Sequence, residues 1–223
     1  MGRTALTVHP DGLSIALSAE LSRPDDAFAL LVLAHGAGAG FRHASMVAIS
    51  EALARRGVAT LRFNFPFSEE GRRRVDAQPV SIACLLAALE TARVEQPDLP
   101  RFLGGHSYGG RMASHAAAAH DLAIEGLVFC SFPLHPSKKP GTTRALHLAD
   151  VPQPMLFLSG TRDDLADRSL LEGVVAGLGG RARLHWLDTA NHGYRVLKRS
   201  RQVGEDVFDE MAGVAADFMR ALC

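Results

Sequence analysis

A serine flanked by glycines is the residue of this chain best placed to act as a nucleophile. Residues 105–109 read Gly-His-Ser-Tyr-Gly, a GxSxG pattern centred on Ser107. The pattern follows a short apolar run and precedes an alanine-rich helical segment. A tight strand-to-helix turn exposes a serine hydroxyl above a sheet, and the flanking glycines let the backbone and the next helix approach closely. The pattern alone also fits a plain glycine-rich turn, so the strand-to-helix context carries the prediction.

A nucleophilic serine needs a base, and the base needs an acid that orients it. In a parallel sheet such groups lie just beyond the carboxyl ends of strands. Two apolar, strand-like runs end in this way: residues 155–159 lead to Asp163, and residues 184–187 lead to His192. The order Ser107, Asp163, His192 predicts a nucleophile, an acid and a base.

Three other aspartates are alternatives to Asp163 as the acid. Asp164 and Asp167 follow it closely, and an aspartate there could instead cap a helix. Asp188 is a further alternative because it lies near His192 in sequence. Asp163 is favoured because it ends the turn after the strand, whereas Asp164 is expected to start the next helix.

His192 is the preferred base among the 10 histidines of the chain. His35 and His106 lie in motif loops, where we expect them to shape the backbone rather than to transfer protons. His115 and His120 fall on the helix after Ser107 and are expected to be packing or surface residues.

The chain resembles the α/β-hydrolase superfamily from about residue 27 to its C-terminus. More narrowly, it is similar to a small family of predicted cap-less hydrolases related to dienelactone-hydrolase-like proteins. That family also includes the hydrolase-like domain of a subunit of a nuclear acetyltransferase complex. The resemblance implies that Ser107 is the nucleophile, Asp163 the acid and His192 the base, but it implies no particular substrate. The matching segments are LAHGAGAG (33–40), RFNFPF (62–67), GGHSYGGRMAS (104–114), FPLHP (132–136), SGTRD (159–163) and ANHGY (190–194).

An acyl-transfer site must also stabilise an oxyanion with backbone N–H groups. Tyr108 follows the nucleophile at the positive end of its helix and is the first expected donor. The second is expected from the loop at residues 35–38, where the resemblance favours Ala37 and then Gly38. The glycines of this loop could instead serve only to turn the chain. The loop lacks the Gly-Lys-Ser/Thr ending of a phosphate-binding loop, which disfavours nucleotide binding.

Charged residues near the predicted site are interpreted mainly as a solvated cluster. Glu69 and Glu70 precede three arginines at residues 72–74, and mutual pairing is favoured over a rim that binds an anionic substrate group. His135 and the lysines at residues 138–139 are alternative rim residues. His35, His43 and His135 lack the spacing of metal ligands, so neither a metal nor another cofactor is expected.

Strand-like and helix-like segments alternate along the chain, which predicts an α/β fold with a mostly parallel sheet flanked by helices. The expected strands are residues 13–22 (an exposed antiparallel edge), 28–34, 58–65, 101–103, 127–132, 155–159 and 184–187. The expected helices are residues 46–56, 81–94, 111–120, 170–178 and 207–222. Residues 133–154 form a long connection with five prolines, too short for a separate domain or a large lid. We therefore expect a single α/β-hydrolase domain over residues 1–223 with little or no cap.

Composition excludes several classes of protein. The chain has 223 residues, of which 47% are hydrophobic and 22% charged, which disfavours disorder. Its 24 basic and 24 acidic residues balance, which disfavours nucleic-acid binding. No apolar run is long enough for a membrane span, and no secretory signal is evident. Cys84 and Cys130 lie in apolar runs and, with Cys223, make an odd count, so a reducing cytoplasm is expected.

The sequence thus predicts a hydrolase of small carboxylic esters that acts through an acyl-enzyme on Ser107. A thioesterase or a small peptidase would use the same triad, and a non-catalytic binding scaffold is the alternative from another class. The expected partner is a small-molecule substrate, and nothing in the sequence indicates an oligomeric state.

Overall fold

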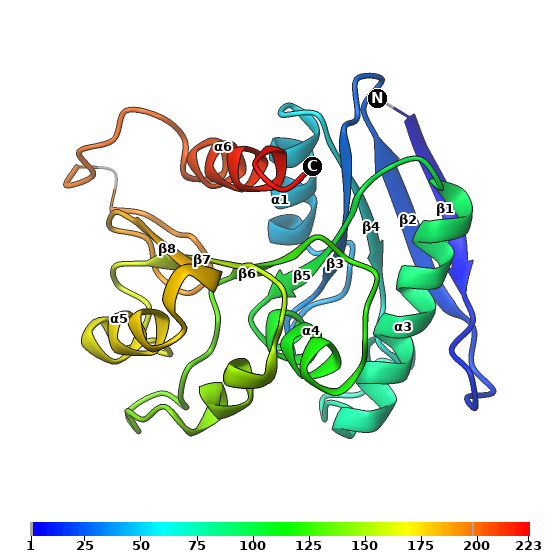
Figure 1. The fold of residues 1–223 in the computed structure, drawn as a ribbon, viewed down its shortest axis with the longest axis horizontal. Helices are drawn as coiled ribbons and strands as arrows, with labels where there is room; N and C mark the ends of the chain where they lie inside the picture. Colours follow the sequence, from blue (N-terminus) through cyan, green and yellow to red (C-terminus); the bar gives the residue numbers. More distant parts are fainter. Residues whose placement is uncertain (1, 198) are drawn as a thin grey trace.

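The structure is a computed structural model that describes residues 2–197 and 199–223, and a single sheet runs through its centre (Figure 1). Eight strands lie in the order β1-β2-β4-β3-β5-β6-β7-β8. The strands are β1 (Gly2–Val8), β2 (Leu17–Arg23), β3 (Ala29–Ala34), β4 (Val58–Phe63), β5 (Arg101–His106), β6 (Gly126–Cys130), β7 (Met155–Gly160) and β8 (Ala182–Leu187). The helices are α1 (Ala44–Ala54), α2 (Pro66–Glu69), α3 (Gln78–Glu95), α4 (Tyr108–Ala119), α5 (Arg168–Gly177) and α6 (Val207–Arg220), with 3₁₀ helices η1 (Thr143–Asp150) and η2 (Gly179–Arg181).

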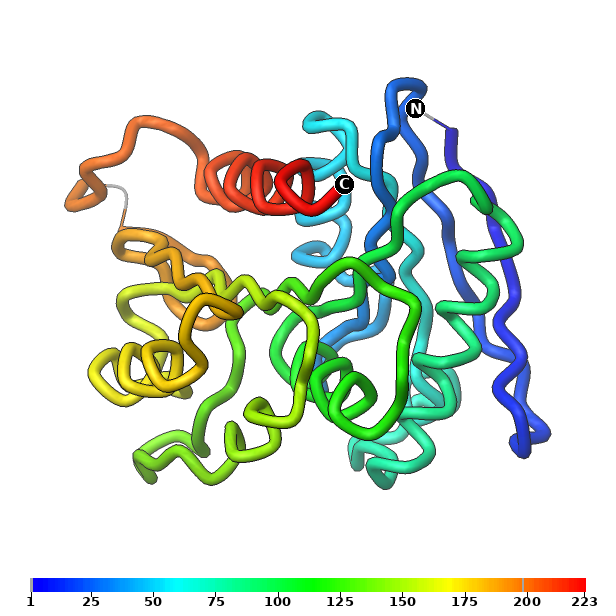
Figure 2. Tube along the Cα trace, in the orientation of Figure 1, coloured from blue at the N-terminus to red at the C-terminus, as the bar shows by residue number. Residues whose placement is uncertain are grey.

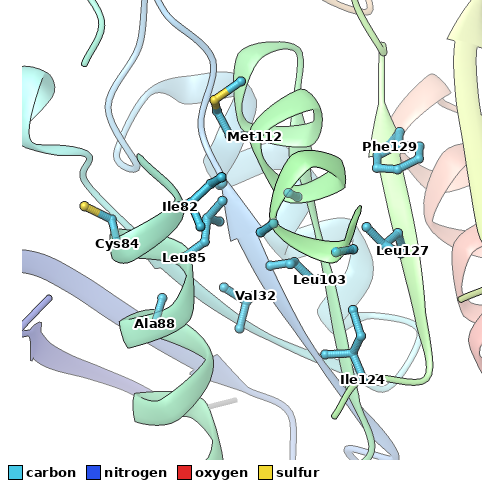
Figure 3. Close-up of a cluster of buried hydrophobic side chains, with 14 of the residues drawn as sticks. Val32, Ile82, Cys84, Leu85, Ala88, Leu103, Met112, Ile124, Leu127 and Phe129 are labelled. Atoms are coloured by element: carbon cyan, nitrogen blue, oxygen red, sulfur yellow. The ribbon is translucent and has the colours of Figure 1, made fainter. Parts of the chain in front are cut away.

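Strand β3 shows why the centre of the sheet is buried on both faces. All six of its residues are buried, and they alternate between two hydrophobic clusters. Leu30 and Val32 pack in the cluster that contains α3 and α4, whereas Leu31 and Leu33 pack in the cluster that contains α1 and α6. Helices therefore cover both faces, and Figure 3 shows the cluster beneath α3 and α4. Each fully buried leucine or valine stabilises such a core by about 1.5 to 3 kcal/mol.

The predicted fold class is confirmed, because β4, β3, β5, β6, β7 and β8 are parallel. The expected edge strand at residues 13–22 is antiparallel as predicted, but it is shorter and is not at the edge. It corresponds to β2, which lies between β1 and β4. Strand β1 was not predicted, because most of its residues are exposed and it has no continuous apolar run.

Two element boundaries near Ser107 differ from the prediction. Strand β5 runs on to His106, because Gly104 and Gly105 continue to pair with β3 on one side and β6 on the other. Helix α4 begins at Tyr108 rather than at residue 111. The turn that carries Ser107 is therefore a single residue between a strand and a helix.

The long connection at residues 133–154 does not form a separate layer over the sheet. Its 3₁₀ helix η1 packs against α4, where Ser114 Oγ lies 2.7 Å from His147 Nε2. Figure 2 shows this segment running beside α4. No large lid was expected in this connection, and the segment packs on the flank of the domain. None of the helices formed by the described residues is both long enough and apolar enough to span a membrane.

Candidate active site

Ser107 occupies a strained backbone position between β5 and α4. Its φ and ψ are 52° and −113°, in a region that L-residues rarely adopt. Close packing on both sides of the turn keeps Ser107 in this strained conformation. A Cβ at Gly105 or at Gly109 would each lie 2.4 Å from the carbonyl oxygen of Ala34. The Ser107 N–H also donates to the Cys130 carbonyl at 2.9 Å, which fixes the turn against β6. These features match the turn that the GxSxG pattern predicts.

We expect Gly109→Ala to destabilise the protein by at least about 3 kcal/mol. The new methyl would meet the carbonyl oxygens of Ala34 and His35 at 2.4 and 2.7 Å, and backbone atoms cannot move aside cheaply. Gly173→Ala is the matched control, since Gly173 also lies in a helix and a Cβ there meets nothing within 4 Å. Chemical denaturation measures both. Equal stabilities of the two variants would contradict the packing described for the turn.

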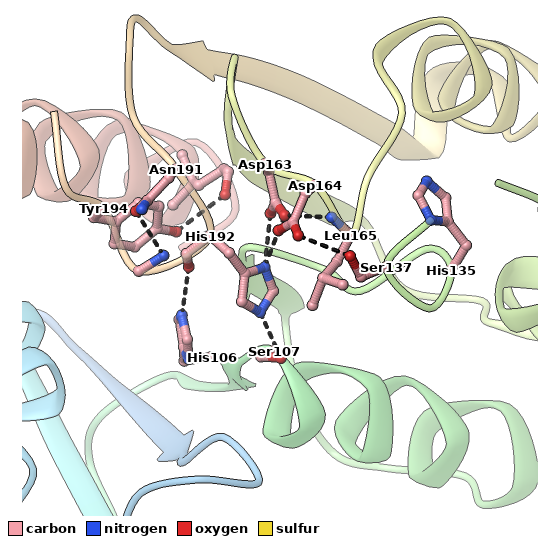
Figure 4. Close-up of polar contacts among 12 residues, drawn as sticks. His106, Ser107, His135, Ser137, Asp163, Asp164, Leu165, Asn191, His192 and Tyr194 are labelled. Carbon is pink, nitrogen blue, oxygen red and sulfur yellow. Dashed lines mark hydrogen bonds and ion pairs between the residues drawn. The ribbon is translucent and has the colours of Figure 1, made fainter. Parts of the chain in front are cut away.

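The structure brings together the three residues predicted as nucleophile, acid and base (Figure 4). His192 Nε2 lies 2.8 Å from Ser107 Oγ. On the other side of the ring, Nδ1 lies 2.8 Å from Asp163 Oδ2 and 3.0 Å from Oδ1. The Asp163 side chain is fully buried, and His192 is 21% exposed. The three residues follow β5, β7 and β8, so the shared carboxyl edge of parallel strands positions them.

The protonation pattern of the histidine follows from its neighbours. An ionised carboxylate only accepts hydrogen bonds, so Nδ1 of His192 carries a proton and donates it to Asp163. Nε2 is then left as an acceptor for the hydroxyl proton of Ser107. This tautomer is the one that a general base needs.

Asp163, not its neighbours, contacts the histidine. It accepts a further hydrogen bond from the Leu165 N–H at 2.9 Å, which fixes the carboxylate. Asp164 instead accepts from Ser137 Oγ at 3.0 Å. The expectation that Asp164 starts the next helix is wrong. That helix begins at Arg168, and Asp167 is its N-cap, because the Asp167 side chain accepts from the Leu170 N–H.

Asp188, the remaining alternative acid, hydrogen-bonds to residues of the following segment rather than to His192. Its carboxylate accepts from the Gln202 N–H at 3.1 Å, and its carbonyl accepts from Arg201. It therefore fixes the segment that follows the base.

A cavity of about 800 Å³ opens beside Ser107. Ala37, one predicted oxyanion donor, lines this cavity together with Ser107 and His192. Tyr108, the other, is the first residue of α4, and the first N–H groups of a helix have no partner within it. The Tyr108 hydroxyl lies 2.7 Å from Ser81 Oγ and thereby anchors α4 to α3. The roles of the two amides remain predictions.

His35 holds the loop that carries Ala37. Its Nδ1 donates to the Gly36 carbonyl at 2.8 Å, and its Nε2 accepts the Phe65 N–H at 3.0 Å. Burial lowers the pKa of His35 to about 4, so the ring is neutral near neutral pH. The expectation that His35 shapes the backbone agrees with these contacts.

The lowered pKa of His35 predicts acid lability. Between its ordinary pKa of 6.5 and about 4, the unfolded chain binds a proton that the folded chain excludes. This stabilisation of the folded chain is fully present above the ordinary pKa of 6.5 and is lost as the pH falls toward 4. The loss is on the order of 3 kcal/mol. His35→Gln keeps an acceptor for Phe65 but cannot titrate. Its free energy of unfolding should therefore fall less steeply with acid than that of the native chain.

The control for this measurement is His120→Gln, because His120 is exposed at the end of α4. This variant should keep the native slope of unfolding free energy against pH. A native slope in His35→Gln would contradict the account of His35.

Arg72 and Arg73 border a second cavity of about 820 Å³, which shares residues 37–39 and His43 with the first. Arg72 pairs with Glu70 and, at 2.6 Å, with Asp76. For Arg72 the expected mutual pairing of charges is therefore present. Among the described residues there is no cluster of three or more His, Cys, Asp or Glu side chains that could hold a metal ion.

Tyr194 is a site residue that sequence reasoning did not single out, although it closes the ANHGY segment. It has a φ of 61° and is almost fully buried. Its hydroxyl donates to the Leu158 carbonyl at 3.0 Å, so it ties the loop that carries His192 to β7. A positive φ at a tyrosine cannot be predicted from the residue type. The only hint of a turn in the sequence is that Tyr194 directly follows Gly193.

A mostly parallel sheet flanked by helices, with a serine turn after β5 and an acid and a histidine after later strands, defines the α/β-hydrolase fold. The chain belongs to the alpha/beta hydrolase domain family, whose model matches residues 27–220. Membership of this family makes the chain a hydrolase by class.

Solved structures with the same fold cover nearly the whole chain. A dienelactone hydrolase from Anabaena variabilis ATCC 29413 is 21% identical, with a TM-score of 0.79 over 99% of this chain and 98% of that one. XC6422 from Xanthomonas campestris, described as an α/β serine hydrolase without a lid, is 20% identical, with a TM-score of 0.73 over 99% and 95%. The esterase domain of a Rhodothermus marinus protein is 18% identical, with a TM-score of 0.73 over 99% of each chain. At these identities the likeness is one of fold.

Proposed function

We propose that the chain is a serine hydrolase that cleaves small carboxylic esters through an acyl-enzyme on Ser107. The observation that carries the proposal is the pair of short contacts on either side of His192, 2.8 Å to Ser107 Oγ and 2.8 Å to Asp163 Oδ2. The Xanthomonas campestris protein is described as a serine hydrolase and the Rhodothermus marinus domain as an esterase, and both have the same fold as this chain. Ester hydrolysis is therefore the first reaction to test.

In the first half of the proposed reaction, Ser107 Oγ attacks the ester carbonyl carbon and its proton passes to His192 Nε2. The carbonyl oxygen becomes an oxyanion, which the N–H groups of Ala37 and Tyr108 are proposed to stabilise. The tetrahedral intermediate collapses, the bond to the alcohol oxygen breaks, and the alcohol leaves with the proton from His192. Asp163 stabilises the imidazolium that exists between these two proton transfers.

In the second half, water takes the place of the alcohol. It attacks the acyl carbon while His192 accepts one of its protons, and collapse of the second intermediate returns that proton to Ser107 Oγ. The free acid is released and the enzyme regains its starting state. No group outside the chain, the ester and water is required by this sequence of steps.

A panel of ester, thioester and amide substrates with one short acyl group tests the proposal. Ester turnover should exceed amide turnover, because an alcohol is a better leaving group than an amine. Preferred thioester or amide turnover would assign the same triad to a thioesterase or a peptidase. Absence of turnover and of acylation by every member would favour a binding scaffold.

We expect short acyl chains to be the better substrates. The segment at residues 133–154 packs on α4 and contributes no residue to the lining of the cavity beside Ser107, so no lid adds an apolar wall that could bind a long chain. Each methylene that a tunnel did bury would contribute about 0.8 kcal/mol, or roughly fourfold in kcat/KM. A nitrophenyl ester series measures this. Values of kcat/KM that climb steadily up to sixteen-carbon chains would reveal a deep apolar tunnel.

We also propose a cytoplasmic location and a small-molecule substrate as the partner. The three cysteines, all free in the structure, agree with a reducing compartment.

A further inference from the structure

The side chain directly before the nucleophile reaches the loop that carries the base. His106 is the last residue of β5, and its Nε2 lies 2.9 Å from the carbonyl oxygen of His192 (Figure 4). A carbonyl oxygen only accepts, so Nε2 carries the ring proton and donates it. This hydrogen bond joins the strand of the nucleophile to the loop of the base, across 86 residues of sequence.

The His106 ring is wedged between two loops. On one side, a Cβ at Gly36 would lie 3.0 Å from His106 Nδ1, so the ring fills the space that a side chain at Gly36 would need. On the other side, its centroid lies 5.3 Å from the His192 ring and 6.1 Å from the Tyr194 ring. Burial lowers the pKa of His106 to about 4, so the ring stays neutral near neutral pH and keeps its donor on Nε2.

Hydrogen bonds within the loop that carries the base close its turn. Asn191 Oδ1 accepts from the Gly193 and Arg195 N–H groups at 3.1 and 2.9 Å. The Tyr194 N–H donates to the Asn191 carbonyl at 2.9 Å. These bonds fix the shape of the loop, whereas the bond from His106 connects the loop to the turn that bears Ser107.

We propose that His106 is a positioning residue that holds the backbone of His192 and so aims Nε2 at Ser107 Oγ. The inference rests on the proposed roles of Ser107 and His192 as nucleophile and base. His106 ends β5 and Ser107 follows it directly, so the hydrogen bond sets the base relative to the nucleophile. A base displaced by about 1 Å lowers the rate by on the order of 10²-fold.

Two variants of similar length test the role of the donor. His106→Gln places an amide N–H near the position of Nε2, whereas His106→Met has similar length and no donor. We expect His106→Met to lower kcat by about 10- to 100-fold, with KM changed by less than about twofold. His106→Gln should recover most of the loss. Equal kcat values for the two variants, or a native kcat in His106→Met, would overturn the proposal in favour of simple packing.

A second measurement needs no substrate. The proton between His192 Nδ1 and Asp163 should give a low-field NMR resonance that reports the orientation of the base. The resonance should persist in His106→Gln and weaken or broaden in His106→Met. An unchanged resonance in His106→Met would refute the positioning role. If His106→Met does not fold, as judged by thermal unfolding, His106→Leu is used in its place.

The two measurements separate the positioning role from the proposed function. If no ester is turned over by the native chain while the resonance still responds to His106→Met, the hydrolase proposal fails and the positioning of His192 stands. If the native chain turns over esters and both variants behave alike, the positioning role fails alone.

Discussion

Ser107→Ala should lower kcat for ester hydrolysis by on the order of 10⁶ if chemistry limits the rate. The substitution removes the Oγ that would carry the acyl group, and water would have to attack without a positioned nucleophile. The fold should survive, since the Ser107 N–H keeps its hydrogen bond to the Cys130 carbonyl. Steady-state turnover of a short nitrophenyl ester measures the effect, with thermal unfolding as the check on folding.

A second serine provides the control. Ser159 is fully buried on β7, and its Oγ has no hydrogen-bond partner among the described residues. Ser159→Ala should therefore leave kcat within about twofold of the native value, because it removes no group that touches the reaction. Native turnover in Ser107→Ala, or an equal loss in both variants, would contradict the assignment of the nucleophile.

Asp163→Asn should lower kcat by on the order of 10⁴. One carboxylate oxygen accepts both His192 Nδ1–H and the Leu165 N–H, at 3.0 and 2.9 Å. In the amide, the carbonyl oxygen would keep the Leu165 N–H, and the NH₂ group would face His192 Nδ1. That arrangement favours the wrong tautomer, with the proton on Nε2 directed at Ser107.

Asp164→Asn is the matched control for the acid. Asp164 is adjacent in sequence but its carboxylate contacts Ser137 rather than His192. The Asp164→Asn substitution should change kcat by less than about twofold. The reverse ranking of the two aspartates, measured on the same ester, would place the acid one residue further along the chain.

The elements that carry the site were predictable because their patterns are strong. The apolar run of β3 is typical of a strand buried on both faces. The glycines around Ser107 favour a tight turn because they stand between a strand-like run and a helical segment. The order of the acid and the histidine after two further strands then follows from the parallel sheet. For these residues, local pattern and tertiary structure agree.

The features that escaped prediction depend on contacts between distant segments. Strand β1 is mostly exposed, so only its pairing with β2 reveals it. The helix after Asp163 begins at Arg168, before the start of the expected helix at residues 170–178, and Asp167 rather than Asp164 caps it. Likewise, the hydrogen bond from His106 to His192 joins the end of β5 to a loop that no local sequence pattern relates to it.

The position of the site follows from the central strands. Strand β3 pairs with β4 on one side and β5 on the other, and the loops after β3 and β5 meet there. The first loop carries Ala37 and the second carries Ser107, so the proposed oxyanion donor and nucleophile lie at the point where the strand order reverses. This is the place where open α/β sheets bind their ligands.

Labelling with a fluorophosphonate tests the nucleophile most directly, because it needs no knowledge of the substrate. The reagent phosphonylates a serine hydroxyl that a neighbouring base activates. Intact mass and peptide mapping should find one adduct, on Ser107, that forms in the native chain and Asp164→Asn but is lost in Ser107→Ala. An unlabelled native chain, or an adduct on another residue that persists in Ser107→Ala, would contradict the account.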